Sequence, residues 1–162
     1  MPEASPIPPH HPQLAVSAAI FRDGKILLVR RAGSPAKGFY SLPGGRVEFG
    51  ETLHAALHRE VDEETALKIE IVDLAGWREV VPGTAGGGHY LIMSFAARWA
   101  ANDVVLNDEL DDFKWLAPDG LGDNIFWQNP WLKPPDNRNV ISRRGNIHII
   151  PGSDEWPDFA HL

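Results

Sequence analysis

The sequence contains no cysteine, and its acidic residues outnumber its basic ones. Without a thiol, disulfides, thiolate catalysis and zinc–thiolate sites are excluded. No apolar run approaches the roughly 18 residues of a membrane-spanning helix, and the N-terminus lacks the basic-then-apolar pattern of a secretory signal. The formal net charge of −7, from 15 Lys and Arg against 22 Asp and Glu, disfavours a nucleic-acid polymer as partner. We expect a cytoplasmic protein that needs neither a membrane nor nucleic acid.

Proline and tryptophan divide the 162 residues into three parts. The first twelve residues, MPEASPIPPHHP, contain five prolines and predict a flexible arm, 1–12. Residues 13–122 suit one compact domain with a single core. Residues 123–162 mix proline with tryptophan and show no convincing amphipathic helix. Their role stays open, and a contact in a homodimer is one interpretation.

Alternating apolar and polar residues predict several strands around one helix. The triplet RDG, 22–24, is typical of a hairpin turn. Thr52 is a plausible N-cap for a helix that ends near Ala66. LPGG, 42–45, is predicted to be a loop whose glycines allow close approach to the backbone. The predicted strands cover 14–20, 25–31, 68–77, 89–99 and 111–116.

The helical segment HREVDEET, 58–65, places four acidic residues within five positions. Like charges one turn apart destabilise a helix. On a helical wheel, Glu60 and Glu64 nevertheless fall in the middle of the apolar stripe, and Glu63 lies on its flank. That stripe consists of Leu53, Ala56, Leu57, Val61 and Leu67. Two carboxylates are therefore expected to point into the protein.

Two buried, ionised carboxylates need compensation. Protonation, pairing with basic groups and a shared multivalent cation would each provide it. Arg59 can pair with Glu63 at i+4, but the wheel turns it away from the two inward glutamates. Divalent ions such as Mg²⁺ take oxygen ligands, so a metal fits best. A charged helix end that merely frays is the alternative.

The segment GRVEFGETLHAALHREVDEETAL, 45–67, resembles the signature of the Nudix hydrolases. That signature is Gly, five residues, Glu, seven residues, Arg-Glu, an aliphatic residue, any residue, Glu-Glu, any residue, Gly and an aliphatic residue. The matching positions are Gly45, Glu51, Arg59, Glu60, Val61, Glu63, Glu64 and Leu67. Ala66 replaces the late glycine, from which we expect a slightly longer helix and no loss of chemistry.

The resemblance implies an α/β protein, an α/β/α sandwich around a central mixed sheet. It implies hydrolysis of a nucleoside diphosphate linked to another group. The Gly44 carbonyl and the side chains of Glu60, Glu63 and Glu64 would then bind Mg²⁺, or Mn²⁺. Arg59 would orient the acidic set, through Glu51 or Glu63.

Two questions stay open within the resemblance. The general base is either Glu63 in the signature or Glu109 in the later loop NDELDD, where a solvated turn charge is the alternative for Glu109. The substrate is a small nucleotide. In the ADP-ribose group of this family a proline commonly follows the signature by about fifteen residues, and Pro82 lies at that distance from Leu67. The resemblance therefore favours ADP-ribose or a related nucleotide sugar as substrate. A MutT-like triphosphate pyrophosphohydrolase is the alternative enzyme, and a non-catalytic nucleotide sensor is the alternative without catalysis.

Residues outside the signature are candidates for substrate contacts. Arg30 and Arg78, and also Arg31, can meet phosphate, although an ordinary surface cation is the first interpretation for each. Tyr40, like Phe39 and Trp77, can stack on a base or pack in the core. We predict a substrate-binding set of Arg30, Arg78, Tyr40 and Pro82.

Overall fold

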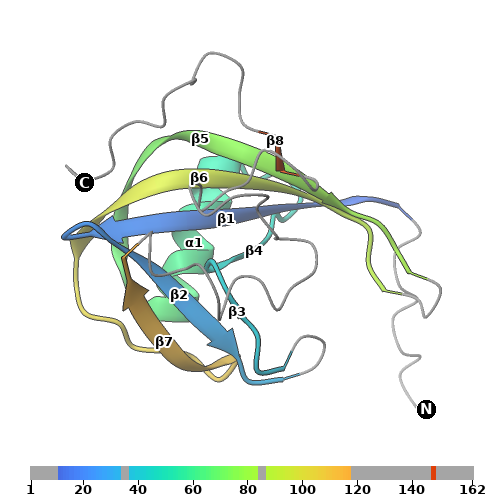
Figure 1. Cartoon of the computed structure of the whole chain (residues 1–162). Coiled ribbons are helices and arrows are strands. Elements are labelled where there is room, and N and C mark those ends of the chain that lie inside the picture. Colours follow the sequence, from blue (N-terminus) through green and yellow to red (C-terminus); the bar gives the residue numbers. More distant parts are fainter. Residues whose placement is uncertain (1–10, 34–36, 84–86, 118–146, 149–162) are drawn as a thin grey trace, which may run out of the picture.

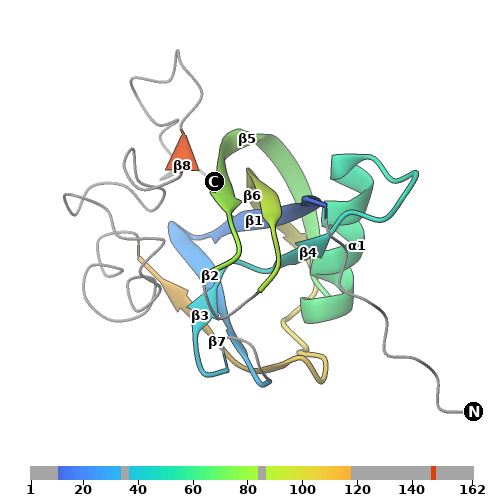
Figure 2. The ribbon, with the colours of Figure 1, turned by 90° about the vertical axis from the view of Figure 1, so that its right-hand side faces the viewer.

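A β-sheet forms the body of the computed structural model, which describes residues 11–33, 37–83, 87–117 and 147–148. Its strands are β1 (Gln13–Arg22), β2 (Lys25–Arg31), β3 (Tyr40–Ser41), β4 (Gly44–Arg46), β5 (Lys68–Val80), β6 (Tyr90–Ala101), β7 (Leu110–Leu116) and β8 (Ile147–His148). Their order is β3-β2-β1-β6-β5-β8, with β4 also paired to β1 and β7 to β2 (Figure 1). Helix α1 (Leu53–Thr65) lies on one face of this sheet (Figure 2).

The sheet is mixed, because β1 and β6 pair in parallel while the other described pairs are antiparallel. The predicted α/β class with a central mixed sheet is therefore confirmed. The predicted strands are confirmed too, and β5 continues to Val80, beyond its expected end. Within the described residues α1 is the one helix, so a second helical layer of the sandwich is not seen there.

The two terminal segments fall largely outside the described part of the chain. Of the predicted arm 1–12 only residues 11 and 12 are described, and of the extension 123–162 only β8. These domain boundaries stay predictions. In the described residues no helix is both long and apolar enough to span a membrane.

The segment predicted as a loop at 42–45 contains the start of a strand, and that prediction was wrong. Gly44 begins β4, which pairs antiparallel with β1 opposite Ser17. A Cβ at Gly44 would overlap the carbonyl oxygen of Val16, so only glycine allows this close pairing. The same property that indicated a loop from sequence thus permits a tight strand contact.

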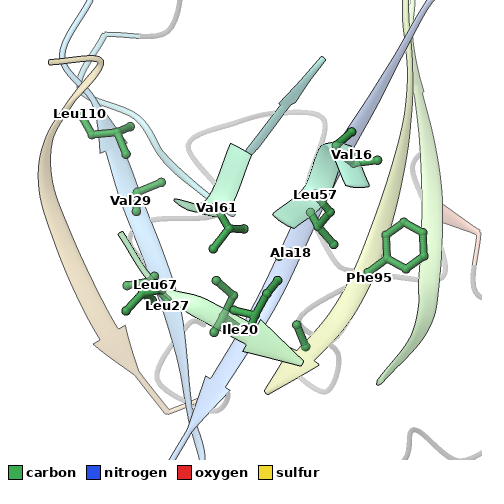
Figure 3. Close-up of a cluster of buried hydrophobic side chains, with 13 residues drawn as sticks. Val16, Ala18, Ile20, Leu27, Val29, Leu57, Val61, Leu67, Phe95 and Leu110 are labelled. Carbon is green, nitrogen blue, oxygen red and sulfur yellow. The ribbon is translucent and has the colours of Figure 1, made fainter. Parts of the chain in front are cut away.

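The hydrophobic core lies between α1 and the sheet (Figure 3). Leu57 and Val61 of α1 are fully buried against Val16 and Ala18 of β1 and against Phe95 of β6. Full burial of a large aliphatic side chain stabilises a fold by about 1.5–3 kcal/mol. This contact confirms the apolar stripe of the predicted helix and fixes which side of α1 faces inward.

The two ends of α1 differ from one another in how well the sequence predicts them. The Thr52 hydroxyl accepts a hydrogen bond from the Ala55 amide at 3.1 Å, which confirms the N-cap. The helix ends at Thr65, and Ala66 takes a left-handed conformation with φ of 60°. The expectation of a longer helix was wrong, because the chain turns at Ala66 to enter β5. A left-handed alanine costs about 1 kcal/mol, which glycine would avoid.

Candidate active site

Arg59, in the middle of α1, is the centre of a hydrogen-bond network. Its Nε and Nη2 bind the two carboxylate oxygens of Glu51 at 2.6 and 2.9 Å. Its Nη1 donates to Glu60 at 2.8 Å and to Glu63 at 3.3 Å, and Nη2 also donates to the Arg46 carbonyl at 3.0 Å. The expectation that Arg59 turns away from Glu60 was wrong, because its long side chain reaches across the helix surface. All three carboxylates are held by one guanidinium.

The pairing with Arg59 sets the charge state of Glu51. The hydrogen bonds from Arg59, followed by the one from the Glu48 amide, lower the pKa of Glu51 to about 2. The same contact raises the pKa of Arg59 above its usual range. The two groups stay ionised across the physiological pH range, so they form a permanent ion pair.

Glu64 is the most buried acid of the predicted set, with a side chain that is only 3% exposed. The Gly44 amide donates a hydrogen bond to its Oε2 at 3.0 Å. Burial raises the pKa of Glu64 to about 7, and the charges of Glu60 and Glu109 add to this effect. No salt bridge to Glu64 occurs among the described residues, so a bound cation would stabilise its ionised form.

Glu60 lies against the glycine strand β4. A Cβ at Gly45 would collide with the Glu60 carboxyl group, so the glycine leaves room for it. Burial raises the pKa of Glu60, although the hydrogen bond from Arg59 acts in the opposite direction. Glu63, by contrast, keeps 57% of its side chain exposed. The inward direction of Glu60 and Glu64 and the flanking position of Glu63 agree with the helical wheel.

The loop between β6 and β7 brings Glu109 near these acids. The backbone of this loop caps the end of α1. Val105 N–H donates to the Thr65 carbonyl at 2.9 Å, and Asn107 N–H donates to the Glu64 carbonyl at 3.2 Å. Asn107 Oδ1 then accepts from the Glu109 amide at 3.1 Å. The exposed Glu109 side chain is close enough for its charge to raise the pKa of both Glu60 and Glu64.

The donor set fits a hydrated divalent cation. Within the described segments, no three His, Cys, Asp or Glu side chains already converge into a closed cage. Mg²⁺ usually keeps several waters and needs only one or two carboxylates together with substrate phosphates. Glu60 and Glu64 offer two carboxyl groups on one helix whose ionised forms are destabilised by burial. Glu63 is bonded to the guanidinium of Arg59, which also holds Glu60. The chemistry of these residues therefore suits Mg²⁺ without a preformed cage.

The predicted substrate residues Arg30 and Tyr40 lie together at β2 and β3. Arg30 Nε pairs with Asp111 at 2.6 Å, and the Tyr40 hydroxyl donates to Asp112. The Lys114 ammonium lies 4.9 Å from the centre of the Tyr40 ring. Both predicted residues thus have protein partners that join β2 and β3 to β7, and their contact with substrate stays a prediction.

Arg78 and Pro82 occur at the other side of the sheet, near the end of β5. Arg78 Nη1 is buried and has no hydrogen-bond partner in the part of the chain that is described. Burial lowers the pKa of Arg78. Pro82 is exposed just beyond the strand. Arg78 pairs with Ile92, and strand alternation places both on the face opposite to Met93, which packs on the core.

Arg31 was named from sequence as a possible phosphate contact but was left out of the predicted substrate-binding set. Its Nε is buried without a hydrogen-bond partner among the described residues, and its charge lowers the pKa of Glu64. In KILLVRR, alternation puts Arg31 on the side of Leu27 and Val29, which are core residues, and Arg30 on the other side. The alternation in this strand therefore predicts from sequence that Arg31 faces the core side of the sheet and Arg30 the other side.

Comparisons with known proteins agree with this geometry. A profile described as the NUDIX domain matches residues 11–143. An ADP-ribose pyrophosphatase of Methanocaldococcus jannaschii is 48% identical over 111 residues, which span 68% of this chain and 65% of that protein. The nucleoside triphosphatase NudI of Salmonella agona is 30% identical, over 65% of this chain and 82% of its own length.

A solved structure shows the same likeness in three dimensions. The crystal structure of a MutT NUDIX hydrolase from Burkholderia pseudomallei matches with a TM-score of 0.66 and 29% identity, over 75% of this chain and 95% of that one. The domain description and the names of these relatives place the chain among the hydrolases that act on phosphoric anhydrides. Because the domain profile covers most of the chain, the protein belongs to the NUDIX family, as the sequence signature indicates.

Proposed function

We propose that this Nudix hydrolase cleaves the diphosphate linkage of ADP-ribose or a related nucleotide sugar in a Mg²⁺-dependent reaction. ADP-ribose would yield AMP and ribose 5-phosphate. The observation that carries the proposal is the buried Glu64, whose raised pKa and lack of a salt-bridge partner among the described residues suit a metal ligand. The 48% identity to a protein named as an ADP-ribose pyrophosphatase supports the substrate.

Glu60, Glu63 and Glu64, with the Gly44 carbonyl, would hold Mg²⁺ or Mn²⁺. A bound divalent ion supplies charge neutralisation at the phosphates and a more acidic water. Arg59 keeps Glu60 and Glu63 in place through its hydrogen bonds, and its ion pair with Glu51 fixes the guanidinium itself. The protein's own part in the chemistry is therefore orientation of the ligands and removal of one proton.

A carboxylate must take that proton from the attacking water, and we propose Glu109 ahead of Glu63. The Glu63 carboxylate is already engaged by Arg59 at 3.3 Å. Glu109 makes no salt bridge within the described residues, and its charge reaches Glu60 and Glu64. Glu109→Gln should therefore lower kcat more than Glu63→Gln does, by about 100-fold against about 10-fold. The reverse order would return the role to Glu63.

On the substrate side, Arg78 and Pro82 are proposed to contact the nucleotide, with Arg30 and Tyr40 as further contacts. Arg78 supports this best, because its buried Nη1 lacks a partner in the described residues, whereas Arg30 and Tyr40 are bonded to Asp111 and Asp112. An anion or a base carbonyl would satisfy the free donor of Arg78. Arg78→Gln should raise KM more than Arg30→Gln.

A MutT-like pyrophosphohydrolase is the second candidate, favoured by the similarity to NudI and to a MutT hydrolase. Products separate the two reactions. With Mg²⁺ and a panel of ADP-ribose, other nucleotide sugars and nucleoside triphosphates, the proposal expects AMP and ribose 5-phosphate from ADP-ribose as the fastest reaction. Release of a monophosphate and pyrophosphate from a triphosphate at a higher kcat/KM would replace it.

The cytoplasmic location and the homodimer stay predictions. Cell fractionation and light scattering of the full chain test them directly.

A further inference from the structure

The loop between β6 and β7 is hydrogen-bonded to the end of α1 at three points. The last carbonyls of a helix lack partners within the helix, so they can accept hydrogen bonds from other segments. The donors and the carbonyls that accept from them are Asn102 Nδ2 to Ala66 at 3.1 Å, Val105 N–H to Thr65 at 2.9 Å and Asn107 N–H to Glu64 at 3.2 Å. These bonds fix the position of the loop relative to the acidic helix.

Asn107 connects this attachment to Glu109. Its side-chain Oδ1 accepts a hydrogen bond from the Glu109 amide at 3.1 Å, and its carbonyl accepts one from the Leu110 amide at 3.2 Å. Asparagine is favoured at the start of tight turns because its side chain can accept from the backbone two residues ahead. Asn107 therefore lies on a short path of hydrogen bonds that leads from the backbone of Glu64 to the backbone of Glu109.

The backbone of Glu109 is held at both of its polar groups, whereas its side chain is not. The amide donates to Asn107, and the carbonyl accepts from the Ala32 amide at 2.9 Å. The next residue, Leu110, is buried in the core (Figure 3). The Glu109 side chain is exposed, and in the described part of the chain no hydrogen bond or ion pair engages its carboxylate. A fixed backbone that carries an unengaged carboxylate suits an acid that must meet a water at a set place.

We propose that Asn107 is a positioning residue of the active site, which holds Glu109 at the distance from Glu64 that proton removal from the attacking water requires. This inference rests on the proposed function, in which Glu64 binds the metal and Glu109 is the base. Only the bond to the Glu109 amide uses the Asn107 side chain. A substitution can therefore remove that bond and leave the backbone bonds to Glu64 and Leu110 in place. Because a displacement of about 1 Å can cost about 100-fold in rate, the loss is measurable.

The test is a double-mutant cycle of Asn107→Ala with Glu109→Gln, assayed for kcat and KM with ADP-ribose and Mg²⁺. Asn107→Ala should lower kcat about tenfold and change KM less than about twofold, because it displaces the base and leaves the substrate contacts in place. In the Glu109→Gln background the same substitution should lower kcat by less than about twofold, because the group that it positions is already lost. Equal losses in the two backgrounds would overturn the inference, since Asn107 would then act on the fold or the metal and not through Glu109.

Two further variants of the same loop serve as controls. Asn107→Asp keeps an acceptor oxygen at the same place, so it should retain kcat within about threefold of the wild type. A loss equal to that of Asn107→Ala would count against the hydrogen bond. Asp108→Asn changes an exposed neighbour whose side chain makes no hydrogen bond among the described residues, and it should match the wild type. A tenfold loss in Asp108→Asn would overturn the inference, because any change in the loop would then lower kcat.

Hydrogen exchange of the Glu109 amide tests the same bond without turnover. Followed by NMR in the nucleotide-free protein, the protection of this amide should fall at least about fivefold in Asn107→Ala and stay near the wild-type value in Asn107→Asp. Unchanged protection in Asn107→Ala would contradict the inference. Should Asn107→Ala fail to fold, Asn107→Gln takes its place in both experiments with the same expectations, because its amide is displaced by one methylene.

The inference and the proposed function fail in different ways. If the wild type leaves ADP-ribose intact, the proposed substrate is rejected, and amide exchange still decides whether Asn107 holds Glu109. If Glu109→Gln keeps the wild-type kcat, the assigned base is rejected, and the positioning role falls with it. If Glu109→Gln loses activity and the losses in the cycle are additive, only the role of Asn107 is rejected.

Discussion

Glu51 and Glu64 are the same type of residue at the two ends of one site, and they meet opposite environments. Glu51, just before α1, receives two hydrogen bonds from Arg59 and has a pKa of about 2. Glu64, near the end of α1, is buried with a single bond from the Gly44 amide and has a pKa of about 7. A protein cation is hydrogen-bonded to the first carboxylate, whereas Arg31 acts on the second only at a distance, without a salt bridge among the described residues. The comparison shows which acid anchors the site and which one is left to bind a cation.

The difference follows from where the guanidinium of Arg59 can reach. Arg59 lies on the flank of α1, so it contacts Glu51, Glu60 and Glu63 without entering the core. Glu64 is on the inward stripe beside Leu57 and Val61, where a protein cation would need its own desolvation. The fold thus accepts a destabilising acid at one position. Such local cost is common at functional sites.

The strongest way to test this comparison is to neutralise the unpaired acid. Glu64→Gln keeps the size of the side chain and removes its charge, so a metal ligand is lost. We expect kcat with Mg²⁺ to fall by at least about 1,000-fold, in the range of lost electrostatic stabilisation at an active site. Glu60→Gln should have a similar effect. Steady-state assays with ADP-ribose measure it, and retention of full activity in either variant would contradict the assigned roles.

The same acid should make the stability of the metal-free protein depend on pH. Glu64 has an ordinary pKa near 4.5 when unfolded and about 7 when folded. Between these values the unfolded state loses its proton first, so the free energy of unfolding falls as the pH rises, by up to about 3 kcal/mol by pH 8. Below pH 4.5 the penalty is absent.

Urea unfolding in EDTA at pH 5 and pH 8 measures this slope, with Glu64→Gln as the matched variant. The variant should lose most of the slope and be more stable than the wild type at pH 8. Adding Mg²⁺ should restore stability to the wild type and not to the variant. An identical pH profile for both proteins would show that the buried acid is not destabilising.

Removing Arg59, the hydrogen-bond partner of Glu51, should have an intermediate effect on activity. Arg59→Gln removes the four hydrogen bonds that hold Glu51, Glu60 and Glu63, together with a fifth to the Arg46 carbonyl. We expect kcat/KM to fall about 10–100-fold, the size of effect seen when residues that orient metal ligands are changed. Arg59→Lys keeps the charge and loses the fork, so it should recover only part. Mn²⁺ titration should show weaker binding in Arg59→Gln, and unchanged Mn²⁺ affinity would argue against the orienting role.

The smallest expected effect concerns the end of α1. Ala66→Gly relieves a left-handed alanine at φ of 60° and should raise the free energy of unfolding by about 0.5–1 kcal/mol. Activity should stay the same, because the hydrogen bonds of Ala66 within the described residues involve the Asp62 carbonyl and the Asn102 side chain, and not Glu60, Glu63 or Glu64. Chemical denaturation compares the variant with wild type, and a loss of stability would mean that φ at this position is negative in solution.

Sequence reasoning succeeded where a pattern repeats over many residues. The long strands β1, β2, β5 and β6 and the apolar stripe of α1 were predictable, because alternation and helical periodicity accumulate with length. The short strands β3 and β4 were not, because two or three residues carry no period and LPGG is equally typical of a turn. The end of α1 was mispredicted, because helix propensity favours alanine while the required turn favours glycine.

For the site, the sequence by itself determined the acids, their spacing and their inward direction, since these follow from residue identity and the helical repeat. The sequence could not tell which acid is paired with a protein cation. Arg59 contacts Glu51 because the loop before α1 folds back onto the helix, and the course of that loop is set by the tertiary structure. The tertiary structure also decided that Arg31 and Glu109 border Glu64, because β2 and the loop after β6 are brought to α1 by strand pairing and by capping of the helix end. Charge compensation depends on distances of a few ångströms between distant segments, and the fold alone sets those distances.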